Sequence, residues 1–514
     1  MAAITGVGAY APRFRITSEA FEDAWGQFHA AGVTQKAVPS ADEDALTMGY
    51  EAATRALEAA ETDPDEIDWL AFASSRPPTA EEDLTARLGA MVALSESATR
   101  HAFTGSTRAG TRALWAALDA LEADSTTALV VAADAPQGDP DDGIDHAAGA
   151  GSAAFVLERE GPAEIVDRAE YSAPYPGTRF RNAGEDETQG LGITQYDRRA
   201  FTETIGGAVA GLEDEPTPDA VAIQAPDGKL PYRAAGAAGV GTEEIRAAAT
   251  VHELGDLGAA SVPVSLATAL ADGYESILAV SHGSGAGADA VVVSVASETR
   301  QSDGDVPAVT ALEGDDPLTY AEYLRQRGIV TTGPPSGGGA YVSVPSWRRS
   351  IPQRYRLEAG RCSECDALSF PPNGACDDCG ALADYEPIEL AGEGTIEAVT
   401  TISQGGAPPE FAEQQAQSGD YAAAIVALET DGASETHRKD GDHAERNSAD
   451  RSSGQRQREE GVDSGDETVS VPAMGTDADP ADFSVGERIE TTIRRIYTQE
   501  GVTRYGFKIR PAGE

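Results

Sequence analysis

Cysteine is absent from almost the whole of this chain. All four cysteines among the 514 residues lie in one short segment, as Cys362-x2-Cys365 and Cys376-x2-Cys379. Two such pairs joined by a short loop can surround one tetrahedral Zn²⁺, so we predict a structural zinc ribbon there. Disulfide pairing is the alternative, but in a cytosolic chain such pairs more often hold metal. No thiol remains elsewhere to act as a nucleophile.

Positive charge is also scarce. The chain has 86 acidic and 38 basic residues, which gives a formal net charge of −48. The few lysines are Lys36, Lys229, Lys439 and Lys508. A chain this acidic repels nucleic acid and anionic membranes, so we expect neither as a partner. Because the acidic residues are spread over the whole length, we interpret them as a solvated surface adapted to high salt, in a halophilic cytoplasm.

Long apolar runs are missing as well. No run of about 18 apolar residues occurs, so we expect no transmembrane helix. The start of the chain, Met1–Gly8, lacks the basic segment and the apolar stretch of a secretory signal. These features predict a cytoplasmic protein.

The first 298 residues alternate between strand-like and helix-like segments. Short apolar runs at Ala3–Val7, Trp69–Ala73 and Ala128–Ala132 are typical of buried parallel strands. The intervening segments Ala45–Ala60 and Ala109–Ala123 have apolar positions at helical spacing. This alternation predicts an α/β fold.

A weak internal repeat is present in the same region. Gly149-Ala-Gly-Ser-Ala-Ala-Phe-Val-Leu157 is similar to Gly285-Ala-Gly-Ala-Asp-Ala-Val-Val-Val293, and both lead from a glycine turn into an apolar strand. The repeat predicts two similar halves, 1–165 and 166–345, the second including a linker. Chance similarity between two Gly/Ala-rich strand entries is the alternative.

The C-terminal third has a different organisation. We predict a helix at Leu318–Arg327, a loop or linker at Gly333–Gly339, the zinc ribbon at 350–387, and a small OB-type barrel at 388–514. The strands predicted for the barrel are Gly394–Ile402, Ala422–Leu428, Arg488–Tyr497 and Thr503–Ile509. Residues 430–468 are so polar that we predict a disordered insertion.

Several sequence blocks resemble the archaeal 3-hydroxy-3-methylglutaryl-CoA synthases. The blocks are Gly6–Ile16, Lys36-Ala-Val-Pro, Asp42-Glu-Asp44, Gln224–Pro231 and Ser281–Gly287, in the order of that family. The resemblance covers about residues 1–345. It implies the thiolase fold, a five-layer α-β-α-β-α sandwich with two equivalent halves that is usually dimeric.

The C-terminal part is similar to zinc-ribbon/OB-fold proteins that accompany acyl-CoA enzymes. The similarity lies in Tyr355–Cys362, Phe370-Pro-Pro372, the four cysteines and Val502–Lys508. Separate proteins of this kind bridge a thiolase and a synthase in archaea. The resemblance therefore implies a fusion of two modules.

The catalytic residues of the synthase family are replaced at the matching positions. Such enzymes use a cysteine to hold the acyl group, a glutamate to transfer a proton and a histidine to orient the second substrate. The cysteine block is similar to Thr107-Arg-Ala-Gly-Thr111, which puts Thr107 at the cysteine. The glutamate block is similar to Ser74-Ser-Arg-Pro77, which puts Ser74 at the glutamate, and Gln224 stands at the histidine.

Two further features bear on function. In the family, the lysine that corresponds to Lys229 approaches the coenzyme A phosphates, and the turn with Gly283 and Gly285 can let backbone approach a ligand. An exposed surface lysine and a simple strand-entry turn are the alternative interpretations.

These observations predict a non-catalytic acyl-CoA-binding partner of a thiolase (acetyl-CoA acetyltransferase) subunit, as a homodimer or hetero-oligomer. The alternative is an active divergent synthase or acyltransferase, in which His101, His252 or His282 activates Ser106 or Thr107. No Gly-x-Ser-x-Gly elbow supports that alternative. A nucleic-acid-binding OB protein is disfavoured by the charge.

Overall fold

The fold is described from a computed structural model of the whole chain. The described residues are 2–295, 306–330, 344–382, 384–403, 405–430, 467–499 and 501–513. The chain divides into two compact units, which we describe separately. Unit 1 contains 1–340, 403–419 and 493–506, and unit 2 contains 341–402, 420–492 and 507–514.

A ten-stranded sheet forms the centre of unit 1. Its spatial order is β5 (Thr99–Thr104), β4 (Trp69–Ser74), β6 (Thr127–Asp134), β7 (Gly151–Glu158), β1 (Ala2–Tyr10), β8 (Ala163–Tyr171), β11 (Ala288–Val295), β10 (Ser276–His282) and β9 (Ala220–Ile223), with β12 (Ala308–Ala311) beside β1. A small second sheet contains β13 (Asp316–Pro317), β2 (Phe14–Thr17) and β3 (Gln35–Val38).

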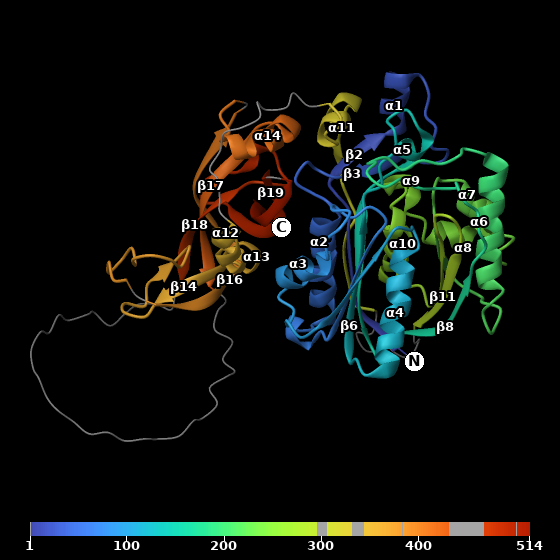
Figure 1. Cartoon of the computed structure of the whole chain (residues 1–514), viewed down its shortest axis with the longest axis horizontal. Helices are drawn as coiled ribbons and strands as arrows, with labels where there is room; N and C mark the ends of the chain where they lie inside the picture. The colour runs from blue at the N-terminus through green and yellow to red at the C-terminus, as the bar shows by residue number, and fades with distance from the viewer. Residues whose placement is uncertain are drawn as a thin grey trace, which may run out of the picture. The chain divides into compact units, whose positions relative to one another are not determined.

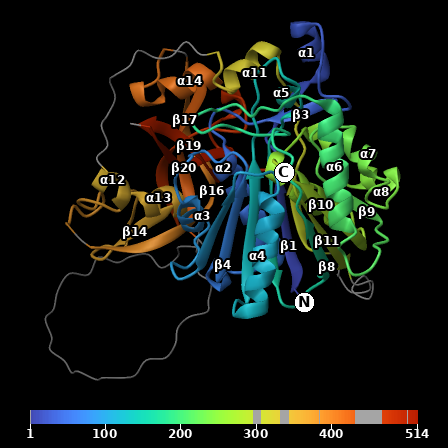
Figure 2. The same cartoon turned by 45° about the vertical axis from the view of Figure 1, so that its right-hand side comes forward.

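Helices cover and separate the two halves of the large sheet (Figures 1 and 2). The longer helices are α2 (Ala45–Ala60), α3 (Leu84–Met91), α4 (Ala109–Ala123), α6 (Thr194–Val209) and α10 (Ser261–Ala271). The shorter ones are α1 (Ser18–Trp25), α5 (Gly143–Ala147), α7 (Leu230–Ala234), α8 (Thr242–Ala247), α9 (Val251–Leu254) and α11 (Tyr320–Gln326). Helix α2 packs on β1, β6 and β7, α4 and α10 lie between the halves, and α6 packs on β8 and β11. The layers are therefore α-β-α-β-α, as the thiolase fold predicts.

The two halves of the sheet repeat the same arrangement. Strand β6 is parallel to β4 and forms an antiparallel pair with β7. In the other half, β10 is parallel to β9 and forms an antiparallel pair with β11. Because β7 and β11 follow the two glycine-rich turns, the predicted internal repeat corresponds to a structural duplication.

The sequence explains why α2 starts and stops where it does. Asp44 is its N-cap and accepts the backbone N–H groups of Leu46 and Thr47, while the Thr47 hydroxyl accepts the Asp44 N–H. This reciprocal capping box fixes the first turn. Glu61 ends the helix in the left-handed conformation with φ 50°. The apolar face between these ends is buried against the sheet.

Most of the elements predicted from the sequence are present. The predicted helices Ala45–Ala60 and Ala109–Ala123 coincide with α2 and α4, and the predicted helix at Leu318–Arg327 contains α11. Strands β4 and β6 are parallel as expected. The prediction of parallel pairing was wrong for most of β1, which is antiparallel to β7 and β8 and parallel to β12 alone among the described strands.

Unit 2 contains the ribbon and an antiparallel sheet. Two short helices, α12 (Val344–Arg349) and α13 (Ile351–Arg356), come before it. The strands are β14 (Glu358–Cys362), β15 (Leu368–Ser369), β16 (Tyr385–Ile402), β17 (Tyr421–Thr430), β18 (Thr468–Met474), β19 (Arg488–Gln499) and β20 (Val502–Pro511), the last two continuing into unit 1. The four predicted barrel strands lie within β16, β17, β19 and β20. Closure into an OB barrel stays a prediction, as do the predicted domain boundaries.

Two returning segments of the chain complete unit 1. Residues 403–419 contribute α14 (Ala412–Ser418), and residues 493–506 contribute Arg494, whose side chain is fully buried. Arg494 donates to Glu51 of α2 at 2.8 Å. Breaking a buried pair leaves an uncompensated charge, so this pair ties the segment 493–506 to α2.

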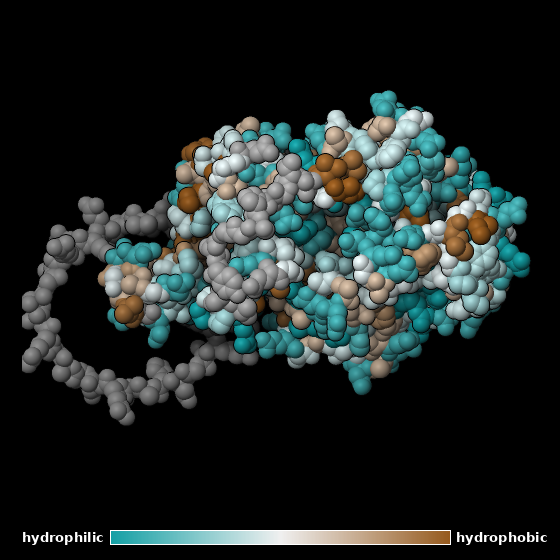
Figure 3. All heavy atoms as spheres, turned by 45° about the horizontal axis from the view of Figure 1, so that its top comes forward, coloured by the Kyte–Doolittle hydropathy of each residue, from teal (hydrophilic) through white to brown (hydrophobic). Residues whose placement is uncertain are grey.

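The predicted linker at Gly333–Gly339 and most of the predicted disordered insertion 430–468 lie outside the described residues. No helix in the described part of the chain combines the length and the hydropathy that a membrane crossing requires. Figure 3 shows a face that is mostly hydrophilic, with apolar atoms in small separate patches.

Candidate functional site

A cavity of about 340 Å³ in unit 1 brings several predicted site residues together. Thr107 at the start of α4, Gln224 after β9 and His282 at the end of β10 all line it. These positions are far apart in the sequence. Gln224 follows β9 and His282 ends the neighbouring parallel strand β10, whose carboxyl ends lie at one edge of the sheet, and the Thr107 hydroxyl is hydrogen-bonded to the His282 carbonyl. Ser74 is absent from the described residues that line this cavity.

Thr107 uses its hydroxyl proton in a structural hydrogen bond. The side chain is 4% exposed, and Oγ1 donates to the backbone carbonyl of His282 at 2.6 Å. A hydroxyl nucleophile needs a base at this proton. A peptide carbonyl cannot accept the proton itself, so this geometry ties Thr107 to β10 without activating it.

His282 is held as a neutral imidazole. Its Nδ1 lies 2.9 Å from Thr204 Oγ1, and that hydroxyl in turn donates to the Ala200 carbonyl at 2.8 Å. Nδ1 is therefore the protonated nitrogen and Nε2 the unprotonated one. Burial, and after it the nearby Arg108 and Arg179, lower the pKa of His282 to about 4. The ring carries no charge at neutral pH.

Gln224 leaves one polar atom unsatisfied beside the cavity. Its Nε2 donates to the Gly258 carbonyl at 2.9 Å, and the side chain is 2% exposed. Its Oε1 has no hydrogen-bond partner among the described residues. A buried acceptor without a partner is costly, so a ligand donor at this point would be favourable.

Ser74 belongs to a separate buried network. Its Oγ donates to Asp134 Oδ1 at 3.2 Å, and the Asp134 carboxylate also accepts the backbone N–H groups of Ser75, Arg76 and Ala259. Both side chains are fully buried. This network connects the ends of β4 and β6 to the start of α10, which explains a polar residue at position 74 without a catalytic role.

An ion pair that the sequence analysis did not identify lies on the cavity wall. Arg179 Nη1 contacts Asp256 Oδ2 at 2.5 Å, and Asp256 Oδ1 accepts the Gly258 N–H at 2.9 Å. Both residues line the cavity, together with His29. Arg179 lies in the irregular segment between β8 and α6, where no periodic pattern marks a site residue.

The glycine turn after β10 has a packing role. Arg108 forms a bidentate ion pair with the fully buried Asp289 of β11. Its Nε donates to Asp289 Oδ2 at 3.0 Å, and its Nη2 donates to Oδ1. A Cβ atom at Gly283 or Gly287 would overlap the Arg108 side chain. Gly285 has φ 81°, a conformation that favours glycine. A ligand role for Gly283 and Gly285 stays a prediction.

Positive charge is present at the cavity, but not from Lys229. Lys229 is exposed and is absent from the described lining residues, although its neighbours Asp227 and Leu230 line the cavity. Two exposed arginines, Arg198 and Arg233, do line it, and no ion pair is recorded for either among the described residues. The phosphate contact of Lys229 remains a prediction.

The other histidines considered as bases are engaged elsewhere. His252 contacts the Tyr232 hydroxyl at 2.7 Å through Nε2 and the Gly32 carbonyl at 2.6 Å through Nδ1. His101 is exposed on β5 and packs beside Trp69. Neither is among the lining residues, so only His282 of the three faces the cavity.

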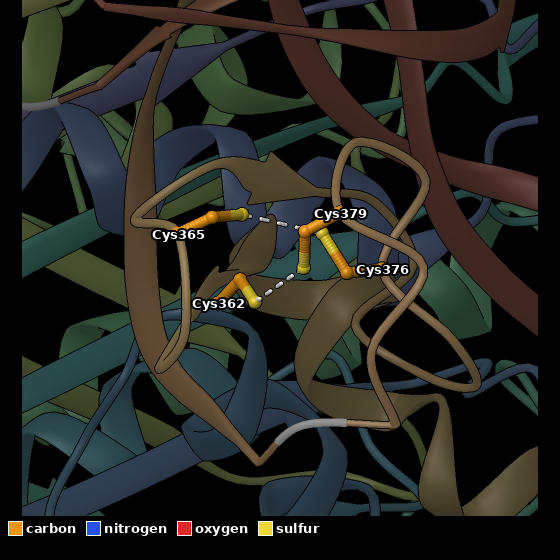
Figure 4. Close-up of side chains that lie close together, drawn as sticks. All are labelled: Cys362, Cys365, Cys376 and Cys379. Atoms are coloured by element: carbon orange, nitrogen blue, oxygen red, sulfur yellow. Dashed lines mark hydrogen bonds between the residues drawn. The ribbon is translucent and has the colours of Figure 1, made fainter. Parts of the chain in front are cut away.

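In unit 2 the four cysteine side chains converge on one point (Figure 4). Their sulfur atoms lie within 4.8 Å of one another, and Sγ–Sγ distances are 3.8 Å for Cys362–Cys379 and 3.7 Å for Cys365–Cys376. Thiolates about 2.3 Å from a tetrahedral Zn²⁺ are about 3.8 Å apart, so the donor set fits zinc. The Asp366 and Gly380 N–H groups donate to the Cys362 and Cys376 carbonyls at 2.9 and 2.8 Å, giving two matching knuckles.

Comparison with known families agrees with both units. Residues 349–384 match the family described as "ChsH2, rubredoxin-like zinc ribbon domain". A hydroxymethylglutaryl-CoA synthase of Pyrobaculum neutrophilum is 30% identical over 338 residues, which are 63% of this chain and 96% of the relative. The corresponding enzyme of Methanocaldococcus jannaschii is 29% identical over 345 residues, 64% of this chain and 99% of the relative.

Solved structures give the same fold. The crystal structure of an HMG-CoA synthase complexed with CoA superposes with a TM-score of 0.55 at 16% identity, covering 66% of this chain and 94% of that one. The HMG synthase of the curacin biosynthetic pathway, in complex with acetyl donor-ACP, gives 0.55 at 14% identity, covering 68% and 94%.

Proposed function

Because this chain belongs to the hydroxymethylglutaryl-CoA synthase family, we propose that it keeps an acyl-CoA-binding cavity but no longer condenses acyl groups. The observation that carries this proposal is the Thr107 hydrogen bond to the His282 carbonyl, since it occupies the hydroxyl at the position of the family's cysteine. The chain has no cysteine outside the ribbon to replace it.

Ligand binding is supported by the lining of the cavity. Cavities of roughly 300–1,000 Å³ with a few well-placed polar groups are typical of small-molecule sites, and 340 Å³ falls in this range. Gln224 supplies an unpaired buried acceptor. Arg198 and Arg233 supply guanidinium groups that suit the phosphates of coenzyme A.

The test of binding is calorimetric titration with acetyl-CoA. We expect the double substitution of Arg198 and Arg233 by Gln to weaken binding about tenfold or more, because charge-assisted hydrogen bonds to phosphate are lost. The control is Arg246→Gln, an exposed arginine paired with Glu243 on α8. Equal affinity in all variants would refute a role for the two arginines.

The test of lost catalysis is to restore the thiol. Thr107→Cys places a sulfur at the start of α4, where helix N-termini lower the thiol pKa. We expect mass spectrometry to detect an acetyl adduct on this variant after incubation with acetyl-CoA, and none on the wild type. Ser106→Cys is the matched control, because Ser106 is absent from the described lining residues.

The alternative function is an active divergent synthase or acyltransferase. The favouring observation is that Thr107 and the neutral His282 ring, whose Nε2 is unprotonated, both line one cavity. Wild-type release of free coenzyme A from acetyl-CoA and acetoacetyl-CoA, abolished in Thr107→Ala, would establish this alternative over the non-catalytic one.

We further propose that the ribbon and the antiparallel sheet of unit 2 attach the chain to a thiolase. Support comes from the match of 349–384 to a zinc ribbon family and from the resemblance of the C-terminal part to proteins that accompany acyl-CoA enzymes. We expect a thiolase to copurify with the wild type and to be lost when Cys362 and Cys365 are both replaced by serine. Recovery of the wild-type chain alone would count against this role.

A further inference from the structure

A second cavity in unit 1, of about 280 Å³, shares no lining residue with the proposed acyl-CoA site. Arg76, Arg327 and Arg495 line it, together with Gln137 and Gln326 and the acidic residues Glu43 and Asp44. Three arginines at one cavity are unexpected in a chain with 86 acidic and 38 basic residues. Their hydrogen bonding indicates what the cavity binds.

Arg76 lies at this cavity, and no ion pair joins its guanidinium to a carboxylate among the described residues. It is half-buried in the loop after β4, where its Nη2 donates to Gln137 Oε1 at 2.9 Å and its Nε to the Asp186 carbonyl at 3.2 Å. Both acceptors are neutral. No carboxylate hydrogen bond to its guanidinium is recorded in the described part of the chain, and the nearby Asp134 carboxylate accepts backbone N–H groups.

Arg327 is more deeply buried and only partly satisfied. Its side chain is 7% exposed, and Nη1 donates to Asp145 Oδ1 at 2.6 Å. Its Nη2 has no partner among the described residues. Asp145 also accepts the Tyr323 hydroxyl at 2.7 Å and lies 4.0 Å from Lys36 Nζ. The Asp145 carboxylate therefore interacts with two buried basic side chains, Arg327 and Lys36.

The positive charges also repel one another. Burial, and after it the neighbouring Arg327 and Arg181, lower the pKa of Arg76, against the weaker opposing effect of Asp186 and Asp134. Arg495 lies at the same cavity with Nε 3.9 Å from Asp44 Oδ2, and that carboxylate also caps α2. Half-buried cations that repel one another are stabilised when an anion lies between them.

We propose that this second cavity binds a phosphate group, held by the guanidinium groups of Arg76 and Arg327 and by the Gln326 amide. Arginine forks match the geometry of phosphate oxygens and give strong charge-assisted hydrogen bonds. Gln326 accepts the Ala41 N–H through Oε1 at 3.0 Å, which leaves its Nε2 as a further donor. The site is separate from the proposed acyl-CoA cavity and does not depend on that proposal.

The size of the cavity indicates a phosphate that carries an organic group. A cavity of about 150 Å³ holds a benzene-sized molecule, so 280 Å³ exceeds what inorganic phosphate needs. Inorganic phosphate and a phosphate monoester share the chemistry that the arginines recognise. The two sources are separated by using inorganic phosphate and adenosine 3′-monophosphate as probes.

The experiment measures the thermal unfolding midpoint of the full chain against each probe, at constant ionic strength set with potassium chloride. A ligand that binds only the folded state raises the midpoint in a saturable way. We expect saturation with both probes for the wild type, and tighter binding of the monoester. Calorimetry on the same samples gives the affinities.

Two variants and one control make the test specific. Arg76→Gln removes a charge, and Gln326→Glu places a negative charge at the cavity edge; each should weaken binding about tenfold or more. Arg246→Gln, on the exposed surface of α8, should bind as the wild type does. If inorganic phosphate binds saturably and adenosine 3′-monophosphate does not, the cavity is a phosphate site, but the inference that its ligand carries an organic group is wrong. The absence of a saturable shift with either probe, or unchanged affinity in both variants, would overturn the proposal.

Discussion

At the scale of single residues, the candidate site holds Thr107 and His282 in structural hydrogen bonds. Thr107, which the sequence predicts to stand at the position of the family's cysteine, donates its hydroxyl proton to the His282 carbonyl. His282 is in turn fixed by Thr204. Thr107 and His282 each have a structural partner, so this pair is ordered without the charge separation that a working nucleophile and base require.

Lys36 gives a prediction about pH. Burial, opposed by Asp145 and reinforced by Arg327, lowers the pKa of Lys36 to about 7 from its usual 10.5. Between these values the unfolded chain binds more protons than the folded chain, so the free energy of unfolding rises with pH from about 7 to 10.5. A shift of this size corresponds to several kcal/mol at most.

We expect denaturant unfolding at a series of pH values to show this rise in the wild type and a much weaker one in Lys36→Met. Lys229→Met is the control, because Lys229 is exposed and its removal should leave the slope unchanged. If the free energy of unfolding of Lys36→Met rises with pH as steeply as that of the wild type, other titratable groups cause the rise.

At the scale of elements, glycines permit the close approach of neighbouring segments. Gly149, just before β7, donates its N–H to the Asp256 carbonyl at 3.0 Å. A Cβ atom there would overlap the carbonyl oxygen of Leu254. In the other half, a Cβ atom at Gly287, which corresponds to Gly151 in the repeat, would overlap the Arg108 side chain. The glycines of the internal repeat therefore serve packing in both halves.

Gly149→Ala should destabilise unit 1, because the segment that ends in Asp256 would have to move. We expect a loss of about 1–3 kcal/mol in the free energy of unfolding, the range for overpacked sites. Gly236→Ala is the matched control, since no atom lies within 4 Å of a Cβ atom there. Equal stabilities of the two variants would show that the segment ending in Asp256 can move at no cost in free energy.

Local patterns in the sequence predicted elements better than they predicted the site. The predicted bounds of α2 and α4 agree with the structure because apolar periodicity and capping act within each helix. The four cysteines were recognisable from spacing alone. Arg179 and Asp256 were missed, since their pairing joins two irregular segments and leaves no periodic signal.

Resemblance to a family also directed attention to residues whose surroundings are structural. Ser74 was identified from a matching block, but its environment is set by Asp134 and the start of α10. The Gly283 turn was considered as a ligand contact, and its tight contact with Arg108 supplies a packing reason for glycine. Whether a residue serves packing or binding depends on contacts between elements that are far apart in the sequence, and a short sequence block carries no information on those contacts.

The ribbon gives a prediction about metal. We expect about one zinc per chain by elemental analysis, because a four-thiolate site binds a single ion. A strong chelator should remove it and abolish the order of residues 349–384, with unit 1 still folded, because the cores of the two units are built from different residues. The variant with serine at Cys362 and Cys365 should contain no zinc and not respond to the chelator. A metal-free wild type with unchanged unfolding would contradict a structural role.

At the scale of the whole molecule, charge is the dominant property. A formal net charge of −48 favours solubility but destabilises the folded state through self-repulsion. Salt relieves this repulsion by shortening the Debye length, from about 10 Å at 0.1 M to about 3 Å at 1 M. Salt can also act by exclusion from the protein surface, as sucrose does, and that effect keeps growing with concentration.

We expect the thermal unfolding midpoint to rise steeply with potassium chloride up to about 1 M and then to level off, because screening is nearly complete at that point. Sucrose at matched osmolality is the control, and it should give a smaller rise without a plateau. If the midpoint rises linearly up to the highest salt concentration, the salt stabilises the protein by exclusion from its surface and not by screening of charge. A midpoint independent of salt would mean that the acidic residues are too far apart to repel one another, and the halophilic interpretation of the composition would then be wrong.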